Sequence, residues 1–134
     1  MTARRGSIRR QVRISAGADE VWAVVGAAER LAEWFPGIAH CSVEGDLRTV
    51  TTGSGLTLPE RILTCDSIER RFQYRITAPL FAEHTSTIDV LDLGDGSCLA
   101  VYSVDAEPSV MALVIGGAGG NALANLKRLV EGAR

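Results

Sequence analysis

Six short extended runs follow one another between residues 38 and 107, and this succession constrains the fold more than any other feature of the sequence. The segments that separate them are rich in glycine, aspartate and serine, residues that suit tight turns. Parallel neighbours would need long crossover connections, so such short turns predict an antiparallel meander. The predicted strands span residues 38–44, 47–52, 56–65, 71–77, 83–91 and 97–106.

A seventh strand and three helical segments complete the pattern. Ile8, Val12 and Ile14 alternate with polar residues, which is typical of a half-buried strand. Two short helical pieces follow and stop at Pro36, and a long helix begins near Ser109. We therefore predict an α+β fold, in which a seven-stranded curved antiparallel sheet wraps around a C-terminal helix. A hollow between sheet and helix is the natural ligand site of such a fold.

Length and composition predict one domain over residues 1–134, with residues 1–6 as a loose tail. The formal net charge of −2 argues against nucleic-acid binding by the surface as a whole. Five arginines nevertheless crowd the first 13 residues. We interpret them as a solvated strand face, and a nucleic-acid or membrane patch is the alternative.

The three cysteines, Cys41, Cys65 and Cys98, lie too far apart for a disulfide framework or a zinc motif. We therefore expect reduced thiols, a cytoplasmic protein, no metal and no cofactor. The apolar stretch 110–115 is too short to cross a bilayer, and no signal peptide precedes the first strand. We expect a monomer or a homodimer, without a membrane span.

Several motifs carry a family resemblance when they are taken in this order: Ala18-Asp19-Glu20-Val21-Trp22, Glu33-Trp34-Phe35-Pro36, Gly45-Asp46-Leu47-Arg48, Pro59-Glu60-Arg61-Ile62 and Phe72-Gln73-Tyr74-Arg75-Ile76. With them the chain resembles the polyketide cyclase/dehydrase and lipid-transport family of the START-like, Bet v 1-like (SRPBCC) superfamily, over about residues 5 to 132. The resemblance implies a helix-grip fold. It does not imply one activity, because the superfamily includes enzymes, carriers and receptors.

Three stretches are also similar to plant abscisic-acid receptors: Ala39-His40-Cys41-Ser42-Val43, Ser54-Gly55-Leu56 and Pro59-Glu60-Arg61. In those receptors a lysine at the position of Ala39 holds the ligand's carboxylate, so this sequence does not fit that ligand. The likeness instead indicates which residues face the hollow: Ala39, Cys41, Glu60, Ile62, Phe72, Tyr74, Ile76, His84, Ser86, Ile88, Ala100, Tyr102 and Val104. Strand alternation supports this independently for residues 71–77 but leaves both faces of 83–91 open.

Glu60, His84 and Tyr74 are the candidate catalytic residues. Glu60 lies in an apolar strand and is either a polar anchor or acid/base with a raised pKa, or a strand-edge charge that pairs with Arg61 or Arg48. His84 is either a proton shuttle, working with Tyr74, Tyr102 or Glu60, or a packed histidine. The predicted ligand-binding residues are Cys41, Glu60, Ile62, Phe72, Tyr74, Ile76, His84, Ser86, Tyr102, Gly120 and Leu123.

Four glycines within residues 116–120 interrupt the expected last helix. Each costs roughly 0.5–1 kcal/mol relative to alanine in a helix, so we predict a break or kink that widens or gates the hollow. The leading functional hypothesis is binding or transport of a small hydrophobic or amphipathic molecule, such as a lipid, polyketide or aromatic metabolite. The alternatives are a polyketide cyclase, aromatase or dehydratase that uses the same hollow, and an interaction module that uses the basic first strand.

Overall fold

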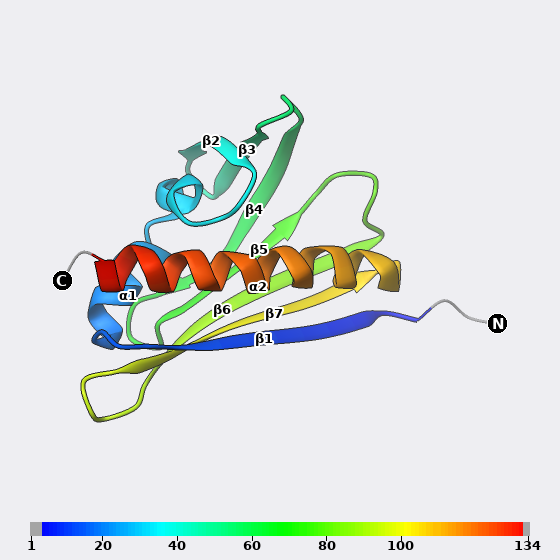
Figure 1. Ribbon diagram of the computed structural model, residues 1–134. Helices are drawn as coiled ribbons and strands as arrows, with labels where there is room; N and C mark the ends of the chain where they lie inside the picture. The colour runs from blue at the N-terminus through cyan, green and yellow to red at the C-terminus, as the bar shows by residue number, and fades with distance from the viewer. Residues whose placement is uncertain (1–3, 133–134) are drawn as a thin grey trace.

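The computed structural model describes residues 4–132 and contains one seven-stranded sheet that wraps along a long helix (Figure 1). All strand pairs are antiparallel, in the order β1-β7-β6-β5-β4-β3-β2. The strands are β1 (Gly6–Ile14), β2 (Ile38–Glu44), β3 (Leu47–Thr52), β4 (Thr57–Asp66), β5 (Arg71–Ile76), β6 (Glu83–Asp92) and β7 (Cys98–Glu107). The helices are α1 (Ala18–Val25), the 3-10 helix η1 (Ala28–Glu33) and α2 (Ser109–Gly132).

This architecture confirms the predicted helix-grip fold, and the strand boundaries differ from the predicted ones by a residue or two at most. Of the predicted tail, residues 1–3 lie outside the described residues, and Gly6 already belongs to β1. Next to it, Arg5 donates to Glu83 at 2.7 Å. β1 pairs along its whole length with β7, so it forms one edge of the sheet.

The inner face of β6, which the sequence left open, is the face of His84, Ser86, Ile88 and Val90. These four side chains are buried, whereas the intervening residues are exposed or half-buried. The inward assignment taken from the resemblance is therefore right for this strand. Ala39 is the exception to that assignment, because it is exposed. The pairing of β2 with β3 shifts by one residue between Ile38 and His40, which carries Ala39 out of the alternation.

α2 continues unbroken from Ser109 to Gly132, so the predicted break is wrong. Two of its glycines serve close packing instead. A Cβ atom at Gly116 would lie 2.5 Å from Ile8 Cγ2, and one at Gly119 would lie 2.7 Å from Tyr102 Cδ1. The missing side chains let α2 lie directly on β1 and β7, and this contact offsets the low helix propensity.

α2 is also long and apolar enough to cross a membrane by length and composition alone. The core helix of a globular domain passes the same test. Here one side of α2, including Ala112, Ala122, Leu123 and Leu126, is buried against the sheet. We therefore assign α2 as the core helix of this fold.

Candidate functional site

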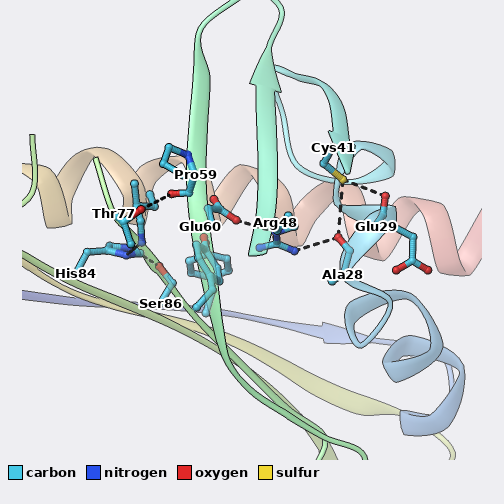
Figure 2. Close-up of polar contacts among 12 residues, drawn as sticks. Ala28, Glu29, Cys41, Arg48, Pro59, Glu60, Thr77, His84 and Ser86 are labelled. Atoms are coloured by element: carbon cyan, nitrogen blue, oxygen red, sulfur yellow. Dashed lines mark hydrogen bonds and ion pairs between the residues drawn. The ribbon is translucent and has the colours of Figure 1, made fainter. Parts of the chain in front are cut away.

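A buried ion pair between Arg48 and Glu60 lies on the inner face of the sheet, on β3 and β4 (Figure 2). The two residues lie opposite each other on β3 and β4, and the register of these strands brings their side chains together. Arg48 Nε donates to Glu60 Oε1 at 2.7 Å, and the two residues are only 2% and 5% exposed. Glu60 is therefore buried and is not a charge at the edge of a strand. Its partner is Arg48, one of the two arginines that the sequence offered for that pairing.

The guanidinium of Arg48 is held on three sides. Its Cζ lies 5.0 Å from the ring centroid of Phe72 and 4.9 Å from that of Tyr74, within the range of cation–π attraction. Its Nη1 donates to the carbonyl of Ala28 at 3.1 Å, which ties β3 to η1. Among the described residues, Nη2 has no hydrogen-bond partner although it is buried. A buried donor without an acceptor costs about 1–3 kcal/mol, so this atom is the unsatisfied point of the site.

Burial dominates the ionisation of Glu60. Desolvation raises the pKa of its carboxyl group, and the attraction and hydrogen bond of Arg48 oppose this shift without cancelling it. Glu60 therefore holds a proton more readily than an exposed glutamate does. The guanidinium remains charged in any case, because arginine does not lose its proton in proteins.

Two buried tyrosines lie beside the ion pair. The hydroxyl groups of Tyr74 on β5 and Tyr102 on β7 are hydrogen-bonded to each other. Burial raises the pKa of Tyr74 to about 12, with the charge of Glu60 adding to the shift, and raises that of Tyr102 well above its usual value. Both phenols therefore stay protonated and can donate or accept a hydrogen bond.

His84 is buried on β6, and both of its ring nitrogens are occupied. The amide of Ile76 donates to Nδ1 at 2.8 Å, so the neutral ring carries its proton on Nε2, which lies 2.8 Å from Ser86 Oγ. Burial, with a contribution from Arg75, lowers the pKa of His84 to about 4. His84 is thus neutral near pH 7, and its hydrogen-bond partners are Ser86 and Ile76, not the predicted Tyr74, Tyr102 or Glu60.

The structure brings most of the predicted ligand-binding residues to one face. Glu60, Phe72, Tyr74, Ile76, His84, Ser86 and Tyr102 are all buried there. Other members are placed differently. Ile62 is half-buried against the core, Leu123 is buried on α2, and the Cys41 thiol donates to the carbonyl of Glu29 at 3.0 Å. Gly120 lies against the side chain of Arg10 at the edge strand, away from the ion pair.

Two residues of the site have a larger part than the sequence analysis gave them. Arg48 entered only as one of two partners for Glu60, yet it carries the unsatisfied donor. Two signals in the sequence favour it: Arg48 lies two residues before Val50, on the same face of the strand, and a buried Glu60 needs a cation. Gly119 was considered only as a helix breaker, and it is the glycine that contacts Tyr102.

Among residues 4–132, no three or more His, Cys, Asp or Glu side chains are grouped so that they could hold a metal ion. The polar cluster consists of hydrogen-bonding groups and one ion pair. Such groups can donate hydrogen bonds to, or accept them from, a polar group placed against this face.

The fold and this inner face define a Bet v 1-like protein of the SRPBCC superfamily. Residues 5–131 match the model of the polyketide cyclase/dehydrase and lipid transport family, and the chain belongs to that family. A comparison with curated protein sequences found no match.

Solved structures share the fold at low sequence identity. The protein XoxI from Bacillus cereus is 21% identical, with a TM-score of 0.85 over 93% of this chain and 95% of that one. The ZhuI aromatase/cyclase from Streptomyces sp. R1128 is 18% identical, with a TM-score of 0.82 over 96% and 94%. Truncated norcoclaurine synthase from Thalictrum flavum is 21% identical, with a TM-score of 0.77 over 97% and 96%.

Proposed function

We propose that this protein binds a small hydrophobic or amphipathic molecule between the sheet and α2, with an oxygen of the ligand accepting a hydrogen bond from Arg48 Nη2. The class includes lipids, polyketides and aromatic metabolites. The observation that carries the proposal is the buried, unpartnered Nη2 atom within a wall of aromatic and aliphatic side chains. An acceptor on the ligand would satisfy this donor, and the apolar body would contact the rest of the wall.

The charge balance favours a neutral oxygen on the ligand. Glu60 already compensates Arg48, so a ligand carboxylate would add an uncompensated charge to a desolvated site. A ketone, ester or phenol oxygen adds none. The hydroxyls of Tyr74 and Tyr102 lie on the same face and offer further hydrogen bonds to such a group.

A cleft of about 400 Å³ opens where the pairing of β5 and β6 ends, beyond Tyr74 and Ser86. Phe81 and His84 belong to its lining, and we propose this end of the sheet as the entrance for a ligand. We place the protein in the cytoplasm, because the thiols of its three free cysteines stay reduced there.

Displacement of a fluorescent fatty acid, together with native mass spectrometry after mild purification, tests the proposal. The key variant is Arg48→Met/Glu60→Met, which removes both charges without leaving one unpaired. The matched control is Arg61→Gln/Asp46→Asn, which removes the exposed ion pair between Arg61, the residue after Glu60, and Asp46. We expect the control to bind as the wild type does and the buried-pair variant to lose affinity for oxygen-bearing ligands. Equal binding by both variants, or no binding by the wild type, would contradict the proposal.

A cyclase or aromatase activity on the same face is the second candidate. The observation in its favour is the hydrogen-bonded pair of phenols beside Glu60, since protonated hydroxyls can orient a ketone and donate a proton to it. Occupation of both His84 nitrogens by protein groups favours binding over proton transfer. Turnover of a poly-β-keto thioester that is lost in Tyr74→Phe, with ligand binding retained, would establish the enzyme instead.

A further inference from the structure

One side of the molecule combines exposed aliphatic side chains with arginines that form no ion pair with a described residue. We call it the β1–α2 face and define it by Arg4, Arg10, Leu80, Val110, Leu113 and Val114. β1 lies along α2 (Figure 1), and the close approach of Ile8 to Gly116 fixes them side by side. This face is separate from the inner face that carries Arg48.

The apolar part of the face comes from the first half of α2 and from the β5–β6 loop. Val110, Leu113 and Val114 are 56%, 59% and 55% exposed, and their spacing of three and four residues places them on one side of the helix. Leu80 is 62% exposed. Its loop is held near the start of α2, because the amide of Ala82 donates to the carbonyl of Glu107 at 2.9 Å. Exposed aliphatic residues gathered from two segments mark an interaction surface.

The segment that contains β1 and the first three-quarters of α2 carry charge of one sign only. Residues 4–14 and 109–126 contain five arginines and no aspartate or glutamate, whereas the whole chain has a formal net charge of −2. Arg5 pairs with Glu83 and Arg13 with Asp95, and Arg9 lies on the outer face of the sheet together with Asp105. Arg4 and Arg10 form no ion pair with a described residue. The stem of Arg10 lies against α2 at Gly120, so its cationic group borders the helix.

We infer that the β1–α2 face docks on an anionic lipid surface, with the exposed residues of α2 inserted among the headgroups and with Arg4 and Arg10 contacting lipid phosphates. An uncharged helix face bordered by arginines is the pattern of interfacial membrane binding. The acidic residues nearest this end, Glu83, Asp105 and Glu107, lie on β6 and β7 at outward-facing positions beside Arg5. They leave the α2 side free of negative charge.

Vesicle sedimentation with the full chain tests this inference. The protein is expected to sediment with vesicles of phosphatidylcholine and phosphatidylglycerol, to bind phosphatidylcholine alone much more weakly, and to be released by salt. Arg4→Gln/Arg10→Gln should lower the partition coefficient about 30-fold, from roughly 1 kcal/mol for each arginine near the surface. Leu113→Ser/Val114→Ser should lower it by about tenfold or more.

Matched variants elsewhere on the surface serve as controls. Leu56→Ser/Ile68→Ser replaces two exposed aliphatic residues in other turns, and Arg61→Gln/Arg71→Gln removes the same charge from outward positions on β4 and β5. Both controls should bind vesicles as the wild type does, and all variants should keep the wild-type unfolding midpoint. The inference is overturned if the wild type binds neither kind of vesicle, or if the controls lose binding equally. A dimer in light scattering that Leu113→Ser/Val114→Ser dissociates, without vesicle binding, overturns it in favour of an interface between two copies.

Discussion

Replacement of Gly119 by alanine tests how α2 is held on the sheet. The new Cβ would lie 2.7 Å from Tyr102 Cδ1 and 3.0 Å from two further ring atoms. The ring cannot swing aside freely, because Tyr102 is buried and its hydroxyl is bonded to Tyr74. Either α2 or the ring must therefore move, and such overpacking costs about 1–3 kcal/mol.

Gly117→Ala is the matched control. Gly117 lies two positions earlier on the exposed side of α2, and a Cβ there would meet nothing within 4 Å. Both substitutions gain the same helix propensity of about 0.5–1 kcal/mol, so the difference between them isolates the contact with Tyr102. Urea unfolding should place Gly119→Ala about 1–3 kcal/mol below Gly117→Ala. For a chain of 134 residues this separates the thermal midpoints by roughly 4–10 °C. If the two variants prove equally stable, close packing is not the reason for glycine at this position.

Three further predictions concern the polar groups of the inner face. Arg48→Met should destabilise the protein by about 3–5 kcal/mol in urea unfolding, because it leaves Glu60 buried and unpaired, and Arg48→Met/Glu60→Met should recover much of this loss. The pKa of His84 falls from 6.5 to about 4 on folding, so the unfolded state binds this proton first as the pH falls. The wild type should therefore lose about 3 kcal/mol more than His84→Gln between pH 6.5 and pH 4, and parallel pH profiles would refute this. Tyr74→Phe should cost about 1 kcal/mol, because Tyr102 loses its partner, and an unchanged midpoint of unfolding would contradict the hydrogen bond.

The sequence predicted the sheet well because its signals are local. Alternation within each strand and the turn residues between strands depend on neighbours in the chain, and they place residues such as Phe72 and Tyr74 on one face. Local alternation could not choose between the two faces of β6, since both carry residues that suit a core. The burial of His84 and Ser86 depends on pairing with β5 and β7, which single-strand patterns do not contain.

The glycines of α2 were misinterpreted for a related reason. Helix propensity describes an isolated segment, and by that measure residues 116–120 should break. The contact that compensates comes from Ile8 and Tyr102, which are distant in the chain. A cluster of glycines can therefore mark either a break in a helix or a place where the helix packs closely on another element. Only the residues that pack against the glycines distinguish these two cases.

The packing of these glycines also determines where a ligand can be accommodated. α2 lies directly on β1 and β7 through Gly116 and Gly119, so the glycines close this half of the interior instead of widening it. The sheet continues from there through β6 and β5 to β4 and β3, which curve away from the helix (Figure 1). Arg48 lies on this far half, with Nη2 unpartnered and Glu60 beside it. The tight contact on β1 and β7 and the unsatisfied donor on β3 are thus two parts of one arrangement, and the proposed ligand recognition falls to β3, β4 and β5.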